Sequence, residues 1–131
     1  MSKINHARPH ALLVCPDGFF KVIDWPAESA QNLRTLYAEI ECDRVDAVDI
    51  THTLTMWVDD EGAIVSNPIE NAFAGLLIYR YATPPQPYFG NVVFTGGVDA
   101  EGNTLGLTDD QTLELVGHVL TVHAIAEQNT L

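Results

Sequence analysis

The stretch HALLVCPDGFFKVID, residues 10–24, carries the strongest fold signal in the chain. Its first part, residues 10–14, is a short and mostly apolar run. Pro16-Asp17-Gly18 follows, where proline presets the φ of a turn and glycine accepts a positive φ. Residues 19–24 then have the pattern of a returning strand. We therefore predict a β-hairpin at this point, as part of a sheet that is mainly antiparallel.

Two helices are predicted to flank further strands of this sheet. Pro26 is well placed to begin the first helix, which should run to about Glu39. Apolar side chains at helical spacing give that helix an inner face: Ala30, Leu33, Leu36, Tyr37 and Ile40. A second, mostly apolar helix is predicted over residues 71–81. One of its faces is formed by Ala72, Leu76 and Tyr79.

The sequence Thr108-Asp109-Asp110-Gln111 indicates where a third helix begins. It has the form of a capping box, and its two acids suit the positive end of the helix dipole. We predict that this helix runs to about Glu127. Its inner face should hold Leu113, Val116, Leu120 and His123.

The middle of the chain supplies the remaining strands. Residues 43–50 are ambiguous, because acids three apart suit a solvated helix face whereas β-branched residues suit a strand. We favour a strand that is bulged or lies at a sheet edge. Residues 52–58 alternate as a half-buried strand does, residues 63–65 suggest a short partner, and residues 91–95 a buried strand. The predicted class is α+β: a small, mainly antiparallel sheet packed with two or three helices.

The chain has the length of one domain, with 131 residues and 47% hydrophobic residues. We expect a loose N-terminal arm over residues 1–9 and a single α+β domain over residues 10–131. No apolar run approaches the roughly 20 residues that span a bilayer. The first residues also lack the apolar core of a signal peptide, so we expect a cytoplasmic protein.

The charge balance excludes two kinds of partner. Eighteen acidic residues stand against six basic ones, for a net charge of −12. Such a field repels phosphate backbones and anionic membranes, so we expect neither direct nucleic-acid binding nor membrane binding. The acidic surface is expected to centre on six residues: Asp43, Asp46, Asp49, Asp59, Asp60 and Glu61.

Catalytic and metal-binding patterns are weak. His118 and His123 are five apart, so they do not converge on one helix face as metal ligands at i and i+4 do. Cys15 and Cys42 have no basic neighbours that favour a thiolate, although a Cys–His dyad formed only in space stays open. No serine lies in a nucleophile elbow, and no glycine pattern forms a phosphate loop. We therefore expect no enzyme, no metal and no cofactor.

One neighbourhood gathers polar and aromatic groups around the second helix. We predict a ligand-binding site there, made of Asn67, Asn71, Tyr79, Arg80, Tyr88 and Asn91. Arg80 is the last basic residue of the chain, and an arginine beside tyrosines can stack on or fork to an anionic ligand. The alternative is that Arg80 pairs with a nearby acid and the tyrosines seal the core.

The order of several short motifs resembles a known family. Ala-Leu-Leu-Val-Cys-Pro-Asp-Gly (11–18) and Ile40-Glu41 precede an acidic Asp-Glu-Gly turn at 60–62. An Asn-x-x-Ala helix start at 71–74 and a Gly-x-Val-Val-x-x-Gly strand at 90–96 follow. This order is similar to a family of small uncharacterised domains, a domain of unknown function, from bacteria, phages and mobile elements. The resemblance covers about residues 10–107. It implies an accessory gene and brings no catalytic residues.

These observations lead to one function hypothesis and two alternatives. The first is a non-enzymatic binding protein, an accessory or anti-defence factor of a phage or mobile element. It would bind a small anionic, nucleotide-like ligand or a host protein. One alternative is an acidic DNA mimic that inhibits a host DNA-binding enzyme. The other is a structural subunit of a homo-oligomer, favoured if Phe19, Trp25 or Trp57 forms an exposed apolar patch.

Overall fold

A computed structural model describes residues 8–62, 68–83 and 86–129 of the chain. Its five strands form one antiparallel sheet in the order β2-β1-β5-β4-β3. The strands are β1 (His10–Val14), β2 (Phe20–Asp24), β3 (Val45–Thr51), β4 (Leu54–Asp59) and β5 (Val92–Thr95). The helices are α1 (Ser29–Ile40), α2 (Ala72–Ile78) and α3 (Asp109–Asn129).

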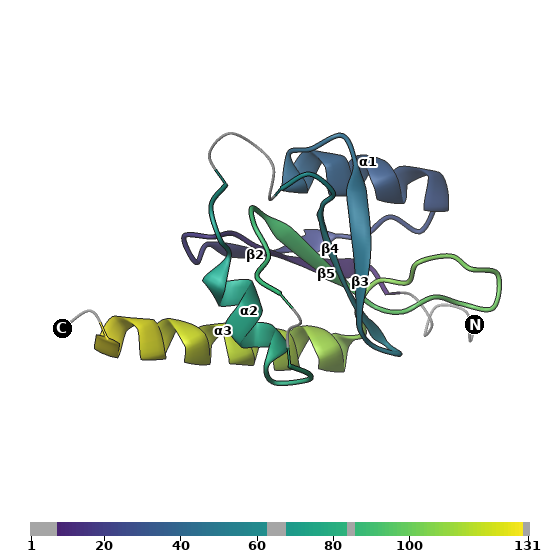
Figure 1. Ribbon diagram of the computed structural model, residues 1–131. Helices are drawn as coiled ribbons and strands as arrows, with labels where there is room; N and C mark the ends of the chain where they lie inside the picture. Colours follow the sequence, from purple (N-terminus) through teal and green to yellow (C-terminus); the bar gives the residue numbers. More distant parts are fainter. Residues whose placement is uncertain (1–7, 63–67, 84–85, 130–131) are drawn as a thin grey trace.

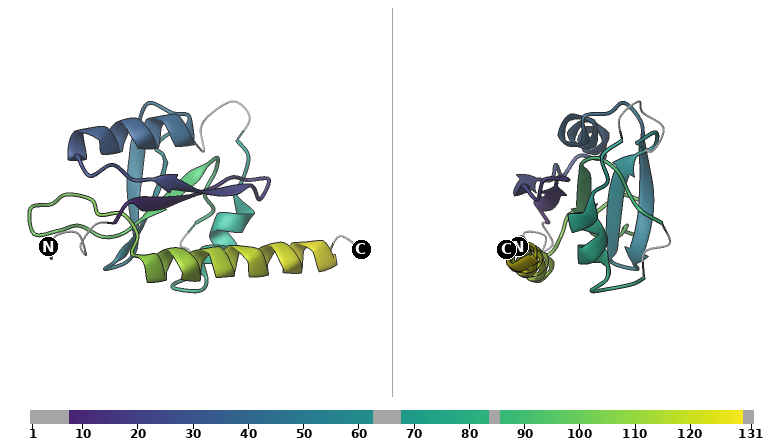
Figure 2. Two further views of the ribbon diagram at one scale, coloured as in Figure 1. Left: turned by 180° about the vertical axis from the view of Figure 1, so that it is seen from behind. Right: turned by 60° about the vertical axis from the view of Figure 1, so that its left-hand side comes forward.

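The elements form three layers, with the sheet in the middle (Figures 1 and 2). Helix α1 covers one face of the sheet, and α2 and α3 lie together on the other. The architecture confirms the predicted α+β class. None of the described helices has the length and apolar character needed to cross a membrane.

The predicted hairpin is confirmed by the register of β1 and β2, in which Leu12 pairs with Val22 and Val14 with Phe20. The turn closes through Gly18, whose N–H donates to the carbonyl of Cys15 and whose φ is +93°. Helix α3 reaches this turn, because the His123 ring packs on Phe73 of α2 and its Nε2 lies 2.6 Å from the Gly18 carbonyl oxygen. Helix α3, which is distant in sequence, therefore holds the β1–β2 turn in place.

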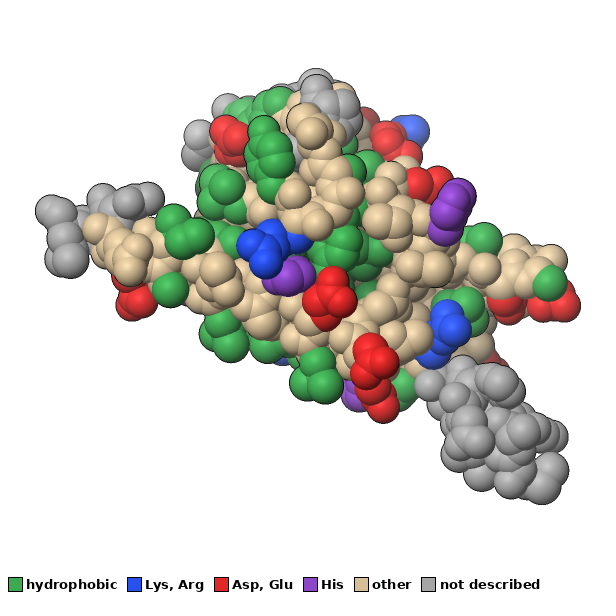
Figure 3. All heavy atoms as spheres, turned by 90° about the horizontal axis from the view of Figure 1, so that it is seen from below, with side chains coloured by type: hydrophobic (Ala, Val, Ile, Leu, Met, Phe, Trp, Pro, Cys, Tyr) green, Lys and Arg blue, Asp and Glu red, His purple; other side chains and the backbone are tan. Residues whose placement is uncertain are grey.

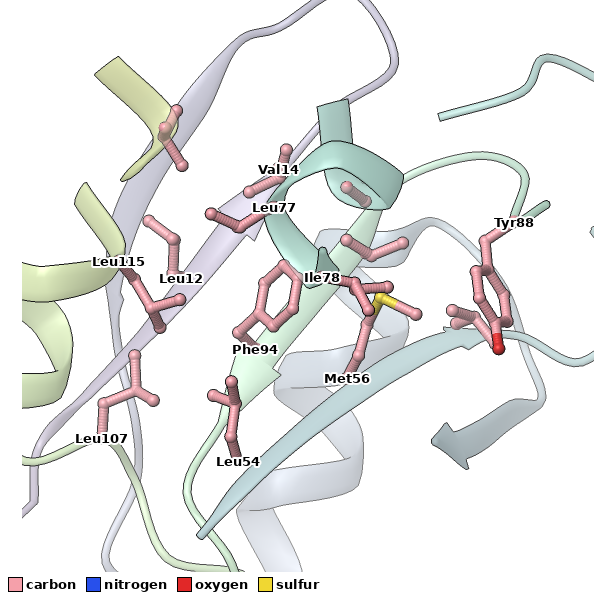
Figure 4. Close-up of a cluster of buried hydrophobic side chains, with 14 residues drawn as sticks. Leu12, Val14, Leu54, Met56, Leu77, Ile78, Tyr88, Phe94, Leu107 and Leu115 are labelled. Carbon is pink, nitrogen blue, oxygen red and sulfur yellow. The ribbon is translucent and has the colours of Figure 1, made fainter. Parts of the chain in front are cut away.

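The core lies on both faces of the central strands. Alternation along β5 sends Val92 and Phe94 towards α2 and α3, and Val93 towards α1. In Figure 4 the Phe94 ring points from β5 towards Leu77 and Ile78 of α2. The α1 side holds a smaller cluster: Ala11, Leu13, Ile23, Trp25, Leu36, Ile40 and Val93.

The strand interpretation of residues 43–50 is confirmed. β3 lies at an edge of the sheet, and its register against β4 shifts between Asp49 and Thr51, as a β-bulge does. The description of β4 as half-buried is wrong. Leu54 and Met56 face the larger core, Trp57 packs in the smaller one, and Thr55 is also buried.

The inner face predicted for the first helix needs correction. α1 begins at Ser29 rather than near Pro26, and its buried residues are Asn32, Leu36 and Ile40. Leu33, predicted to face the sheet, is about half exposed. Asn32 takes a core position, where its side-chain N–H lies 3.5 Å from the carbonyl oxygen of Thr104.

The two other helices also turn a different face to the core than predicted. α2 ends at Ile78, so Arg80 and Tyr81 lie beyond it, and it buries Ala74, Leu77 and Ile78 instead of the predicted face. In α3 the buried residues are Leu115, Val119 and Val122. Of the predicted inner face, Leu113 and Leu120 are exposed, whereas Val116 packs against the larger core and His123 packs on Phe73. The capping box of α3 is confirmed in both directions, through Thr108 N–H to Gln111 Oε1 and Gln111 N–H to Thr108 Oγ1. The predicted strand at 63–65 lies outside the described residues.

Candidate functional site

A cleft of about 670 Å³ opens where the β1–β2 turn, the end of α1 and the start of β5 meet, at the left-hand end of the sheet in Figure 1. Its apolar lining includes two strongly exposed side chains, Phe19 at 54% and Ile69 at 60%. Ile40 and Phe89 add further apolar surface. Apolar side chains left open to water around a concave surface are typical of a binding site.

The charged side chains that line this cleft are all acidic. Asp17 comes from the hairpin turn, Glu41 from the residue after α1, and Asp59 from the end of β4. Among the residues that the structure describes, no Lys or Arg lines this cleft. A ligand in this cleft would therefore meet a negative field, and groups of positive charge would be favoured there.

Two asparagines of the predicted ligand site form hydrogen bonds that join the segments around the cleft. Asn71 is 1% exposed and caps α2 by accepting from the Ala74 N–H at 3.0 Å. Its side-chain N–H groups donate to the carbonyls of Val14 at 3.0 Å and Gly90 at 2.8 Å. Asn91 lines the cleft and donates to the carbonyl of Glu39 at 3.1 Å. Asn71 therefore joins β1, α2 and the segment before β5, and Asn91 ties that segment to α1.

The other predicted ligand residues do not gather at the cleft. Tyr88 is buried at the edge of the larger core, beyond Met56 in Figure 4. Burial and the nearby Asp46 carboxylate raise the pKa of its phenol. Tyr79 and Arg80 are exposed at the end of α2 and are not lining residues of the cleft. Asn67 lies outside the described residues.

Cys15 contributes a thiol to the cleft, but its surroundings disfavour the reactive form. Burial raises the pKa of this thiol, and the carboxylates of Asp17, Glu41 and Glu39 raise it further. Lys21 opposes them only weakly, and its ammonium lies 3.6 Å from Glu39. Because the thiolate is the nucleophile, Cys15 presents a neutral thiol near pH 7.

A histidine and a carboxylate lie close together at another place on the surface, on α3. His118 Nε2 lies 3.5 Å from Glu114 Oε2 on α3, and the Tyr81 hydroxyl donates to the same oxygen at 2.8 Å. The Glu114 side chain is 56% exposed, so this contact is open to water. Across the described ranges, no group of three or more His, Cys, Asp and Glu side chains is placed to hold a metal ion.

The six residues of the predicted acidic surface belong to several places. Asp59, Asp60 and Glu61 lie at the turn after β4, and the Asp60 carboxylate is 3.3 Å from Arg44. In β3, Asp46 lies beside Val48 on the side of the larger core, whereas Asp49 is an odd number of residues away and points to the other face. On the α3 side, carboxylates appear in separate groups between apolar and neutral side chains (Figure 3).

Sequence reasoning did not find the apolar lining of the cleft. Phe19 and Ile69 are far apart in the chain, and neither belongs to a strand or helix. The one local signal was Phe19 itself, a large apolar residue placed directly after a Pro-Asp-Gly turn. Such a residue commonly packs in the core, so only its exposure identifies it as part of a site.

Comparisons with known proteins identify a family but no characterised relative. One family model, DUF3846 (Domain of unknown function), matches residues 8–120. No curated protein and no solved structure matches the chain. The matched range contains all of α2. It also extends past residue 107, where the motif resemblance ends, into the first half of α3. These segments are therefore part of the family's domain.

Proposed function

We propose that this chain, which belongs to the DUF3846 family, is a non-enzymatic binding domain that holds a partner protein in its cleft. The observation that carries the proposal is the exposure of Phe19 and Ile69 at the mouth of a cavity of about 670 Å³. Exposed apolar side chains around a hollow gain free energy when a partner removes them from water. The protonated thiol of Cys15 supports a binding role rather than covalent catalysis.

The lining of the cleft favours a protein over a small anionic ligand. Asp17, Glu41 and Asp59 would repel a nucleotide-like molecule, and the cation expected to hold it, Arg80, is not part of the lining. Arg80 and the exposed Tyr79 are neighbours in sequence, so a stacked anion at the end of α2 stays the alternative. Nucleotide titrations followed by thermal shift would test it, with Arg80→Gln as the variant that should abolish any response.

A DNA-mimic function receives less support. Such a surface needs rows of exposed acids, and the two acids of β3 point to opposite faces of the sheet. Of the three residues expected to form the patch of an oligomeric subunit, Trp25 is buried and Trp57 is half-buried with its Nε1–H on Thr95 Oγ1, but Phe19 is exposed. The oligomeric-subunit alternative therefore stays open, and the net charge of −12 weighs against it.

We further propose that the domain is an accessory or anti-defence factor of a phage or mobile element and acts in the cytoplasm. The support is the motif order, which resembles domains from such elements. Gene neighbourhood tests this setting: phage, plasmid or defence genes beside the coding gene are expected. A steady position among housekeeping genes would contradict it.

The binding function can be tested by affinity capture from cells that carry the gene. The variant Phe19→Ser/Ile69→Ser removes the two exposed apolar side chains and should disturb the fold little, because both are more than half exposed. We expect the wild-type protein to enrich a partner that this variant loses, as measured by quantitative mass spectrometry.

A matched control makes the capture experiment specific. Leu113→Ser/Leu120→Ser removes two comparably exposed apolar side chains from α3, away from the cleft lining. This control should retain the partner. Equal capture by the cleft variant, or loss of the partner in the α3 control alone, would contradict the proposed site.

A further inference from the structure

A second hollow, of about 300 Å³, lies next to the cleft on the side of β3 and β4. The two cavities share Asp59, Gly62 and Phe89 as lining residues. The two adjacent hollows are together called here the acidic groove, at one end of the sheet. It starts at the β1–β2 turn and reaches the side chains of Asp46 and Val48 on the edge strand β3.

Carboxylates follow the acidic groove along its length. Asp17 and Glu41 lie at the end near the hairpin, Asp59 lies in the shared middle, and Asp46 and Asp60 lie at the end near β3. In the part of the chain that the structure describes, no Lys or Arg lines either cavity. Within the described ranges, Asp60 is the only one of the five whose carboxylate forms an ion pair, with Arg44. The groove thus carries negative charge that the protein itself leaves largely uncompensated.

Apolar surface alternates with these charges. Phe19 and Ile69 border the first cavity, Phe89 lies at the junction, and Val48 and Val58 line the second cavity beside the ring of Tyr88. An occupant can therefore place apolar side chains in two separate hollows while it presents charged groups to the carboxylates between them.

We propose, resting on the proposed binding function, that the acidic groove takes an extended segment of a partner protein in which basic and apolar side chains alternate at every second position. Every second side chain of an extended chain points to the same side, so both kinds then face the groove. Charge complementarity selects this occupant. Lys or Arg side chains of the segment gain from the four carboxylates of the groove other than Asp60, and Leu- or Phe-sized side chains fill the hollows. A second copy of this chain fits poorly, because its net charge of −12 would repel the groove. Nucleic acid and acidic peptides are repelled for the same reason.

Synthetic peptides test the occupant directly. Three fluorescein-labelled peptides of about eight residues alternate Lys with Leu, Glu with Leu, or Lys with Ser at every second position, with Ser at the positions between. An extended chain of this length spans about 26 Å. Each is titrated into the full chain, with anisotropy for affinity and ¹⁵N-resolved NMR for location. We expect the Lys/Leu peptide to bind at least about tenfold tighter than the others, and to weaken as salt rises from about 50 to 500 mM.

A single charge removal locates the effect in the groove. Asp59→Asn, at the shared middle, should weaken the Lys/Leu peptide about two- to fivefold. Glu41→Gln/Asp59→Asn should weaken it further. The matched control is Glu101→Gln, an equal change of charge at the exposed turn of residues 99–102, beyond the opposite end of β5, and it should leave the affinity unchanged.

The outcomes separate the inference from the function on which it rests. Amide shifts at Asp59, Phe89 and Asn91 with the Lys/Leu peptide support the occupant. Equal or tighter binding of the Glu/Leu peptide at these residues overturns the charge argument and leaves the binding function standing. Equal binding of Lys/Ser overturns the role of the apolar hollows. Absence of shifts with every peptide overturns the inference, while the Phe19→Ser/Ile69→Ser capture experiment judges the function independently.

Discussion

At the scale of single residues, buried polar side chains determine how the cleft is built. Asn71 uses one amide group to cap α2 and to bind the carbonyls of Val14 and Gly90. Its side chain is fully satisfied and almost completely buried, so it supports the site rather than touching a ligand. The sequence placed Asn71 at the start of this helix and among the predicted ligand residues, but the bonds from its side chain to the carbonyls of Val14 and Gly90 depend on residues far away in the chain.

Replacing Asn71 by alanine should therefore destabilise the fold strongly. Asn71→Ala leaves the Ala74 N–H and two carbonyls without their partner, and we expect a loss of about 2–4 kcal/mol in the free energy of unfolding. Asn91→Ala, which removes one half-buried hydrogen bond, should lose only about 1 kcal/mol. Urea denaturation followed by circular dichroism measures both variants, and equal losses would contradict the assigned role.

The thiol of Cys15 should react slowly and at unusually high pH. Burial and the carboxylates of Asp17, Glu41 and Glu39 raise its pKa, so the thiolate fraction near pH 7 is reduced. In a Cys42→Ser background, the rate of alkylation by iodoacetamide should keep rising beyond the pH at which a free thiol levels off. Asp17→Asn/Glu41→Gln should move that midpoint towards lower pH. A profile like that of a free thiol would show that the carboxylates have no such effect.

At the scale of elements, the spacing of apolar residues in a helix says little about which side of the helix faces the sheet. α3 is apolar on more than one side, and its buried side chains are Leu115, Val119 and Val122, while Leu113 and Leu120 stay exposed. The capping box fixed where the helix starts, because that interaction is local. Which side faces the sheet was decided by contacts with α2, β1 and the hairpin turn.

The hydrogen bond between Tyr81 and Glu114 joins the segment after α2 to α3. Burial and this hydrogen bond raise the pKa of the Tyr81 phenol well above its usual range. Because the folded state holds the phenolic proton more tightly, the associated stability is complete below about pH 10, the pKa of an unfolded tyrosine, and is lost as pH rises further. The contact should therefore matter at neutral pH and fade in alkali.

Tyr81→Phe tests this link between the two helices. At pH 7 we expect a loss of about 1 kcal/mol in the free energy of unfolding, since one hydrogen bond to a carboxylate disappears. Above about pH 10 the difference between variant and wild type should shrink. Denaturant titrations at pH 7 and pH 11 measure it, and a difference that is constant with pH would contradict the shifted phenol.

At the scale of the whole molecule, acidic side chains lie on the edge strand β3 of the sheet. β3 is an edge strand whose exposed positions include Asp46 and Asp49, one on each face, and a bulge interrupts its register. Charges and bulges on an edge strand oppose pairing with a second sheet. The same charge distribution leaves the acidic groove open to the basic partner proposed for it.

Removing the two edge charges should allow the sheets of two molecules to pair. Asp46→Thr/Asp49→Thr keeps β-forming side chains on β3 and deletes both carboxylates. We expect dimers at high protein concentration, seen by size-exclusion chromatography with light scattering. Asp109→Thr/Asp110→Thr makes the same change of net charge at the start of α3 and should remain like wild type. A monomeric β3 variant at all concentrations would argue against edge protection by these acids.

The sequence by itself determined the local features of this protein. The hairpin over residues 10–24, the capping box at Thr108 and the edge character of β3 each depend on neighbouring residues, whose turn chemistry and alternation act without tertiary contacts. The family was also accessible, because it rests on the order of short motifs. The acidic balance that disfavours nucleic acid was visible in composition alone.

Only the tertiary structure decided the inner faces of the helices and the identity of the site. The cleft is assembled from segments that begin near Cys15 and end at Asn91, and no local pattern links them. The predicted ligand residues were divided by packing: Asn71 and Tyr88 were drawn into the interior, while Tyr79 and Arg80 stayed in solvent. The physical reason is that burial depends on which surfaces meet across the sheet, and that is settled by long-range contacts.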